Sequence, residues 1–445
     1  MNPAAGDGAR RPGETASMAD AGIQKSSDQY TDKFLVLLDP EAQERGMAAL
    51  RSSAGIAPAE RIRSAGAEST AEILDQAGAV ILEDLGVGIA AVEPDQRQAM
   101  MATAQDNSSI LTVERERIVY ASQRTLAPGE AATADYLRGF QDGVGELVAH
   151  TLQRMEATLT PEAAAAAFDE RRAAWSVQAI RALESRFTGQ GVKVAVLDTG
   201  VDTDHPDLAG RIDGTASFVP GETVEDTHGH GTHCIGSACG PISPRSTPRY
   251  GVAGGARILA AKVLDRRGRG GDAGILQAMN WAASQGCRVI SMSLGMPVPE
   301  GTPHSRVFEQ VARRLLRAGV LIVAAAGNES ERPGLVAPVG HPANCPSIMA
   351  VGSIGRTLEP SSFTCGGQVD IAAPGEDICS AAPGGGYTLM DGTSMATPHV
   401  AGVIALLAEA HPQATAAELK SLLLAEARRL PLPATDVGAG LLQAP

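Results

Sequence analysis

Three side chains of this 445-residue chain could together carry out nucleophilic hydrolysis. Asp198 follows an apolar run, His230 lies in a glycine-rich segment, and Ser394 precedes an alanine-rich stretch. A serine hydroxyl needs a base to remove its proton, and a neutral imidazole in that role needs a carboxylate to fix its tautomer. The order Asp, His, Ser therefore predicts a serine nucleophile, its general base and an orienting carboxylate.

The segment after Ser394 predicts how a developing negative charge would be stabilised. Residues 395–407 are apolar and rich in alanine, with Pro398 near their start, which is typical of a helix. Ser394 would then lie at the amino end of this helix. Unpaired backbone N–H groups and the positive end of the helix dipole favour an oxyanion at that position.

Segments around the three residues resemble the signatures of the subtilisin-like serine proteases. They are Val-Ala-Val-Leu-Asp-Thr-Gly at 194–200, His-Gly-Thr-His at 230–233 and Gly-Thr-Ser-Met-Ala-Thr-Pro-His-Val-Ala-Gly at 392–402. The resemblance extends from about residue 175 to about residue 424. It implies that Asp198 orients, His230 is general base and acid, and Ser394 is the nucleophile of a serine endopeptidase.

The same resemblance implies an oxyanion hole and a substrate-binding cleft. Ala324–Glu329 is similar to the family's oxyanion-hole segment, in which the side-chain amide of Asn328 would assist the backbone N–H of Ser394. Two further segments resemble the strands that hold a substrate in extended form by main-chain hydrogen bonds. The residues implied to bind substrate are Gly268, Arg269, Gly270, Ser293, Leu294, Gly295 and Gly327. Charged Arg269 and Asp272 indicate outer subsites that are less apolar than in broad-specificity relatives.

The pattern of the chain changes along its length and predicts four parts. Residues 1–30 have the composition of a disordered tail, and residues 31–121 alternate strand-like and helix-like stretches as a small α+β domain with an antiparallel sheet does. Residues 122–174 indicate a helical connector. In residues 175–445 short apolar strands alternate with helices, which predicts an α/β fold with a mostly parallel sheet between two helical layers. The family resemblance implies the subtilisin-like three-layer form of this fold.

The layout of the first domain resembles the inhibitory, folding-assisting propeptide of the same family. Its last strand-like residues, 118–121, would occupy the active-site cleft until the chain is cut between Tyr120 and Trp175. The expected partners are therefore protein or peptide substrates and the chain's own propeptide-like domain, which makes the protein an autoprocessed zymogen. A broad degradative role and the processing of one precursor are both open.

Composition excludes several other classes of function. Lys and Arg number 37 against 51 Asp and Glu, so the formal net charge is −14, opposite to the balance of proteins that bind nucleic acid or anionic membranes. We identify no apolar run long enough to span a membrane and no secretory signal in the first thirty residues, which favours a cytoplasmic location over non-standard secretion. The six cysteines include no Cys-x-x-Cys pair and are expected to be reduced, buried thiols.

Two groups of side chains resemble metal ligands, but the sequence predicts that the protein needs no cofactor. His228, His230 and His233 have a spacing that also occurs in metal-dependent hydrolases, which is one alternative function, but Thr232 stands where such enzymes usually carry Asp. Asp207 lies where many relatives bind calcium. The loop 239–250 that would supply the other ligands contains few oxygen donors, so calcium is not expected there.

Further predictions concern two histidines, one cysteine and a second alternative function. His233 and His399 are expected to be structural histidines, and Cys234 a small buried residue close to His230. The second alternative function is a catalytically silent pseudoprotease, whose cleft only holds peptides. Labelling of Ser394 by a fluorophosphonate would distinguish it from an enzyme.

Overall fold

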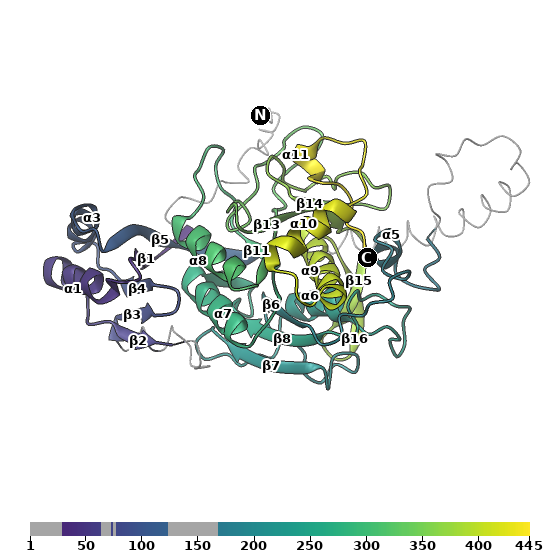
Figure 1. The fold of residues 1–445 in the computed structure, drawn as a ribbon, viewed down its shortest axis with the longest axis horizontal. Coiled ribbons are helices and arrows are strands. Elements are labelled where there is room, and N and C mark those ends of the chain that lie inside the picture. The colour runs from purple at the N-terminus through teal and green to yellow at the C-terminus, as the bar shows by residue number, and fades with distance from the viewer. Residues whose placement is uncertain (1–28, 64–72, 74–76, 123–167) are drawn as a thin grey trace, which may run out of the picture.

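The fold is taken from a computed structural model, which describes residues 29–63, 73, 77–122 and 168–445 (Figure 1). Most of the expected tail (1–30) and of the expected helical connector (122–174) lies outside these residues. The described chain has a first region, residues 29–122, and a second region, residues 168–445. Each region provides most or all of one seven-stranded sheet, and the second region also contains a two-stranded sheet. Among the described residues, no helix combines the length and the apolar character that crossing a membrane requires.

A seven-stranded parallel sheet lies at the centre of residues 168–445. Its order is β14-β13-β12-β10-β6-β8-β7, and every neighbouring pair is parallel. This confirms the parallel sheet that the alternation of strands and helices predicts. The strands are β6 (Lys193–Asp198), β7 (Ile212–Ser217), β8 (Arg257–Lys262), β10 (Val289–Met292), β12 (Leu321–Ala325), β13 (Met349–Ile354) and β14 (Ile371–Pro374).

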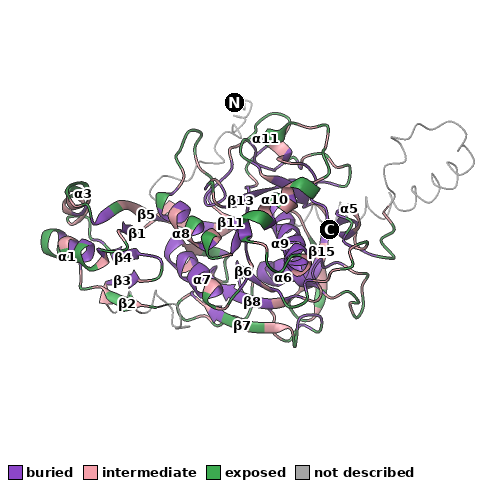
Figure 2. Ribbon diagram, in the orientation of Figure 1, coloured by how far each residue is buried: buried purple, intermediate pink, exposed green. Residues whose placement is uncertain are grey.

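Helices cover both faces of this sheet, as the alternation of its residues requires. Val194 and Val196 of β6 belong to the apolar cluster that includes α6 (His230–Cys239), α9 (Thr393–Ala410) and α10 (Ala416–Glu426). Ala195 and Leu197, which point to the opposite face, belong to the cluster of α7 (Asp272–Ser284) and α8 (Arg306–Arg317). The strands other than the edge strand β7, and the facing sides of these helices, are largely buried (Figure 2). The predicted three-layer α/β fold is confirmed.

Smaller elements frame the sheet, and most of them are absent from the sequence-based prediction. Two short helices, α5 (Trp175–Ala179) and α11 (Ala434–Val437), lie near the ends of the region. An antiparallel hairpin joins β15 (Ile378–Ala382) to β16 (Gly386–Met390). Two short strands, β9 (Arg269–Gly271) and β11 (Leu294–Gly295), project from the carboxyl-end side of the sheet and pair outside it.

The sheet of residues 29–122 is antiparallel apart from one pair. Its central strand β1 lies between β4 and β5, and β3 continues the sheet beyond β4, while the short β2 runs parallel to β3. One face packs against its own helices α1 and α3, and the other against α7 and α8 of the second region. The elements are β1 (Tyr30–Leu38), α1 (Gln43–Ala54), β2 (Glu60–Ile62), β3 (Ala79–Leu82), β4 (Val87–Ala91), α3 (Arg97–Asp106) and β5 (Ile110–Ala121).

Strand β5 belongs to both regions. Residues from Ile110 to Arg117 pair with β1, and residues from Ile118 to Ala121 pair with β9 on one side and β11 on the other. The last residues of the N-terminal sheet are therefore inserted between two strands of the second region.

Candidate active site

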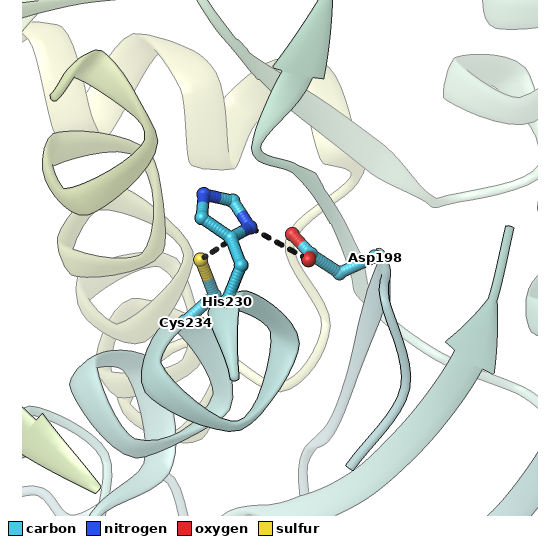
Figure 3. A group of neighbouring side chains, drawn as sticks. All are labelled: Asp198, His230 and Cys234. Carbon is cyan, nitrogen blue, oxygen red and sulfur yellow. Dashed lines mark hydrogen bonds and ion pairs between the residues drawn. The ribbon is translucent and has the colours of Figure 1, made fainter. Parts of the chain in front are cut away.

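Asp198 and His230 form the buried centre of the site (Figure 3). Asp198 is the last residue of β6, and His230 is the first residue of α6. The Nδ1 atom of His230 lies 2.7 Å from Oδ1 of Asp198, and both side chains are almost fully buried. Burial alone would lower the pKa of His230, but the adjacent carboxylate outweighs it and raises the pKa well above the usual value. This carboxylate fixes the ring so that Nε2 is left for a substrate or nucleophile.

Asp226 holds the turn that places His230 at the start of α6. Its carboxylate accepts hydrogen bonds from the backbone N–H groups of Gly229 and Thr232, both at 2.8 Å, and from the hydroxyl of Thr199 at 2.9 Å. Burial would raise the pKa of Asp226, but these hydrogen bonds lower it below its usual value. Sequence analysis did not identify Asp226. Its signal is an aspartate just before a glycine-rich turn, the position from which this side chain caps neighbouring backbone.

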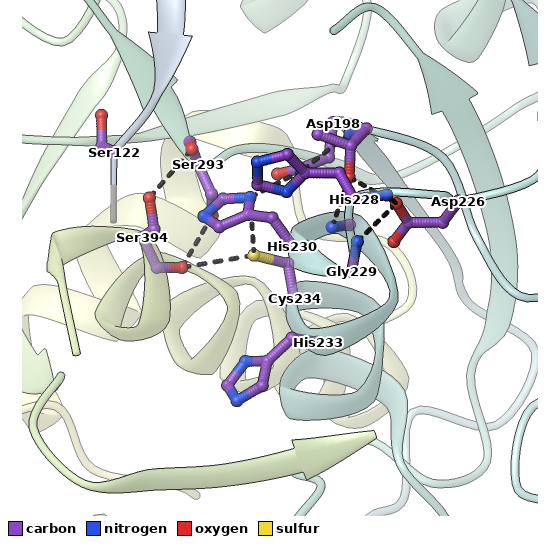
Figure 4. Close-up of polar contacts among 12 residues, drawn as sticks. Ser122, Asp198, Asp226, His228, Gly229, His230, His233, Cys234, Ser293 and Ser394 are labelled. Carbon is purple, nitrogen blue, oxygen red and sulfur yellow. Dashed lines mark hydrogen bonds and ion pairs between the residues drawn. The ribbon is translucent and has the colours of Figure 1, made fainter. Parts of the chain in front are cut away.

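Ser394 lies in the first turn of α9, one residue after the helix begins at Thr393. Its Oγ donates a hydrogen bond to the backbone oxygen of Ser293 at 2.9 Å (Figure 4). Among the described residues His230 Nε2 has no hydrogen-bond partner. Both side chains are buried and both residues contact Cys234, whose Sγ lies 3.6 Å from the backbone oxygen of Ser394 and 3.8 Å from His230 Nδ1. The serine hydroxyl and the imidazole are not hydrogen-bonded to each other. Such bonds often form only when substrate is in place.

Asn328 presents its amide toward a carbonyl of the chain itself. Its Oδ1 accepts hydrogen bonds from the backbone N–H and the hydroxyl of Thr393, both at 2.9 Å. Its Nδ2 donates to the backbone oxygen of Ser122 at 2.6 Å. Thr393, which sequence analysis did not single out, thus fixes which way the amide points. The carbonyl that Asn328 contacts is the one following β5.

The residues after Arg117 lie in the cleft as an extended substrate would. Ala121 and Tyr120 pair with Leu294 and Gly295 on one side. Tyr120 and Val119 pair with Arg269 and Gly270 on the other, and the N–H of Ala121 donates to the oxygen of Gly268 at 2.9 Å. The N–H of Ser122 donates to the oxygen of Ser293 at 3.2 Å. Of the residues implied to bind substrate, all contact this segment apart from Gly327.

Gly327 has a different place. Its φ is +117°, and its N–H donates to the hydroxyl of Thr393 at 3.3 Å. A Cβ atom there would lie 2.9 Å from Cys365 Sγ and 2.5 Å from Glu329 Oε2, so a larger residue would be both strained and crowded. Gly327 therefore keeps the segment before Asn328 close to α9.

The three histidines of the metal-site alternative do not converge. His233 Nε2 lies 2.9 Å from the oxygen of Ile378, and burial lowers its pKa to about 3. Burial also lowers the pKa of the half-buried His228. Within the described part of the chain, the side chains close enough to share a metal ion are Asp198, His230 and Cys234 instead. The metal-dependent hydrolase that the histidine spacing allowed is not favoured by this geometry.

The cysteines and His399 are buried or half-buried and pack within the fold. Cys234 Sγ lies 3.8 Å from His230 Nδ1, and burial raises the pKa of the thiol. All six cysteines are free and five are buried, which confirms the expectation for all but the half-buried Cys379. His399 is buried with Nδ1 2.7 Å from the oxygen of Met395, and burial lowers its pKa to about 4.

Asp207, the residue considered for calcium, is occupied by protein donors. The hydroxyls of Tyr250 and Tyr387 donate to its Oδ2 at 2.9 and 2.8 Å. Its Oδ1 accepts a longer hydrogen bond, 3.3 Å, from the backbone N–H of Arg245. Hydroxyl protons directed at a carboxylate disfavour a hard cation on the same oxygen. That calcium is dispensable at this position stays a prediction.

The second region of the chain is similar in sequence to known proteins. The model of the subtilase family matches residues 189–441. Subtilisin E of Bacillus subtilis (strain 168) is 42% identical over 240 residues, which are 53% of this chain and 60% of that protein. The subtilisin of Bacillus pumilus is 42% identical over 240 residues, 84% of its length, and Subtilisin BL of Lederbergia lenta is 41% identical over 271 residues, 94% of its length. The match thus covers less than two thirds of Subtilisin E and most of the other two.

Proposed function

Because the chain belongs to the subtilase family, we propose that it is a serine endopeptidase that hydrolyses peptide bonds through an acyl-enzyme on Ser394. His230 accepts the proton of Ser394 as its oxygen attacks the scissile carbonyl, and returns it to the leaving amine. Asp198 orients His230 and stabilises the imidazolium. Water then attacks the ester with His230 again as base, which releases the acid and restores the serine.

One contact carries this proposal. Asn328 Nδ2 donates to the carbonyl oxygen of Ser122, and the cleft strands hold the residues before that carbonyl in extended form. An oxyanion hole is recognised by a preorganised donor directed at the oxygen on which charge will develop. The carbonyl carbon of Ser122 is accordingly the position that Ser394 attacks, with Asn328 and the backbone N–H of Ser394 stabilising the oxyanion.

The same contact supports a zymogen cut after Ser122. Residues 29–122 would act as the inhibitory propeptide-like domain, since β5 fills the cleft that a substrate must enter. The first product of the enzyme is then its own chain, divided into a segment ending at Ser122 and a segment beginning with Gln123. Later substrates are proteins or peptides that adopt the same extended form.

The test is the intact mass of the purified full chain over time beside its Ser394→Ala variant. We expect the wild type alone to divide, with masses that place the cut after Ser122, and the variant to remain whole. Equal division of both chains would rule out Ser394 as the nucleophile. Asp204→Asn, an exposed carboxylate outside the site, is the matched control and should divide at the wild-type rate.

Two reagents separate this proposal from the alternatives. A fluorophosphonate should label the wild type and not Ser394→Ala, whereas a peptide-binding pseudoprotease would remain unlabelled. A chelator should leave peptide hydrolysis unchanged, whereas a metal-dependent hydrolase would lose its activity. Loss of activity with chelator and no labelling would replace the serine proposal by the metal one.

A further inference from the structure

The outer end of the cleft contains a buried carboxylate that the proposed catalytic steps do not use. Asp272, the first residue of α7, is fully buried. Its Oδ1 lies 3.0 Å from Nε2 of His341, which is buried as well. Asp272 directly follows β9, and the backbone of His341 pairs with Met296, which directly follows β11. The two side chains therefore connect the two walls of the cleft.

The other oxygen of this carboxylate receives the strand that fills the cleft. Oδ2 of Asp272 accepts the backbone N–H of Arg117 at 3.1 Å and lies 3.4 Å from its guanidinium Nη1. Counted back from Ser122 as the first residue before the cut, Arg117 is the sixth. Its side chain is only 14% exposed. The contact is therefore a largely desolvated charge pair at a defined distance from the scissile bond.

Departure of the segment ending at Ser122 would leave this carboxylate half satisfied. Oδ1 would keep His341, while Oδ2 would lose both of its donors. Any extended substrate can return the first donor, because every residue except proline has a backbone N–H. The second donor is a charged guanidinium, and only a long cationic side chain can replace both its hydrogen bond and its charge.

We propose that Asp272 is a specificity residue that selects a cationic side chain, arginine before lysine, at the sixth residue before the scissile bond. This rests on the proposed endopeptidase function and on a cut after Ser122. Arginine is preferred because its planar group offers several donors in a fixed arrangement, whereas the lysine ammonium is a more strongly hydrated point charge.

Glu114 limits the size of the effect. Its Oε2 lies 3.2 Å from Nη1 of Arg117, so in this structure the guanidinium is shared between two carboxylates. Glu114 belongs to the segment that departs. The cationic side chain of an ordinary substrate would therefore contact Asp272 without a second carboxylate from Glu114. A single charge-assisted hydrogen bond of this kind changes kcat/KM by about 10-fold.

The experiment compares three fluorogenic peptides on the self-processed full chain. The first is acetyl-Arg-Ile-Val-Tyr-Ala-Ser, the sequence of residues 117–122, joined to aminocoumarin, and the others carry Gln or Glu in place of Arg. Active sites are counted by fluorophosphonate titration. We expect kcat/KM to fall about 10-fold from Arg to Gln and further to Glu, because a glutamate would face Asp272. The preference for Arg over Gln should drop to about 2-fold or less in Asp272→Asn.

The controls separate the subsite from general effects. Glu300→Gln removes one exposed carboxylate beyond the cleft strands and should keep the wild-type preference. A purely structural role for Asp272 would lower hydrolysis of all three peptides equally in Asp272→Asn. An unchanged preference there, or no preference in the wild type, would overturn the proposal.

Rejection of the endopeptidase function can be distinguished from rejection of the role proposed for Asp272. No hydrolysis and no fluorophosphonate labelling would reject the enzyme, and β5 would then stay in the cleft. In that case the contact is measured in the unprocessed full chain, by urea unfolding of Arg117→Gln, Asp272→Asn and the double variant. A double variant that loses less stability than the two single variants combined would support the recognition of Arg117 by Asp272. Additive losses would reject it.

Discussion

The two seven-stranded sheets of the described chain are buried in different ways. The parallel sheet of residues 168–445 is covered on both faces by helices of its own region. The sheet of residues 29–122 has its own helices α1 and α3 on one face only. Its other face, which includes Leu35 and Leu37, packs in the cluster that contains Phe308 and Val311 of α8.

This difference links folding of the first region to occlusion of the second. A domain of about 90 residues with one apolar face uncovered is marginally stable, because little of its surface is removed from water. Residues 29–122 obtain the missing half of their core from the region whose cleft they fill. The apolar contacts with α7 and α8 that complete their fold thus also hold β5 in the cleft, where it would block the active site.

The largest effect is expected inside the catalytic region alone. Asp198→Asn should lower the rate of cutting after Ser122 by about 10⁴-fold, because the histidine loses the carboxylate that fixes its tautomer. The intact chain should unfold at the same temperature as Ser394→Ala, since neither change touches the face that packs on α7 and α8. The measurement is the time course of intact mass, with the exposed Asp213→Asn as control. A loss smaller than tenfold would contradict the assigned role.

The second largest effect on catalysis is expected at Asn328, whose Nδ2 contacts the carbonyl oxygen of Ser122. Asn328→Ala should lower kcat for peptide hydrolysis by ~10²–10³-fold with little change in KM, a magnitude established on a subtilisin itself. Thr393→Val removes one of the two donors that orient the Asn328 amide and should lower kcat less. Steady-state kinetics on the self-processed chain decide the matter. Equal effects on KM and kcat would point to substrate binding instead.

Sequence patterns predicted the second region well, whereas the contact between the two regions was expected only from the family resemblance. The apolar runs of β6, β8, β10, β12 and β13 are bounded by turns, and their alternation with helices determines a parallel sheet. Alternation in residues 110–120 predicted a half-buried strand. It could not identify the pairing partners β9 and β11, because they lie about 150 residues further along and hydrogen-bond through backbone atoms that carry no sequence signal.

The site shows the same division. The triad residues and Asn328 were assigned from motifs and lie together in the structure. The motifs say nothing of the hydrogen bond from Ser394 Oγ to the backbone oxygen of Ser293, because a side-chain rotamer leaves no pattern in the sequence. Three consecutive glycines, residues 384–386, are typical of a tight turn and could have predicted the one between β15 and β16.

An apolar contact between the regions should have the third largest effect. Leu35 is fully buried in the cluster shared with α7 and α8. Leu35→Ala should destabilise the docked domain by about 2–5 kcal/mol, the range for a fully buried leucine. Met101→Ala, at a side chain that is 43% exposed, is the control and should change little. The readout is the concentration of separately added segment 29–122 that inhibits the self-processed enzyme, and equal inhibition by both variants would contradict the shared core.

The carboxylate of Glu114 in β5 should contribute less than Leu35 to the stability of the docked domain. Glu114 Oε1 accepts the backbone N–H of Arg306 at 2.7 Å and that of Val307 at 3.3 Å, at the amino end of α8. Loss of such a cap costs about 0.5–2 kcal/mol. Inhibition by the segment carrying Glu114→Gln should therefore weaken by about 2- to 30-fold. Stronger inhibition than by the wild-type segment would show that the charge is not stabilised there.

The smallest effect is a dependence of docking on pH. Burial raises the pKa of Glu116 in the docked state, although the hydroxyl of Thr31 and the N–H of Ala273 favour its ionised form. The charge of Lys33 lowers this pKa and that of Asp272 raises it. A raised pKa stabilises docking below the pKa of the free carboxyl, and this contribution is lost as pH rises through the docked value. Inhibition should weaken as the pH rises above about 4.5, and less so in Glu116→Gln, when measured by titration with the segment at each pH.

The continuity of β5 has a kinetic consequence. A cut after Ser122 removes none of the backbone pairs that hold residues 110–121, because every one of them precedes the broken bond. Chemistry and opening of the cleft are then successive events with separate rates, and the second is the dissociation of a bound strand. Activation should begin with a slow phase, the dissociation of the strand, whose rate constant does not depend on dilution. Once the first free molecules digest segments that others release, activation accelerates, and this later phase slows on dilution.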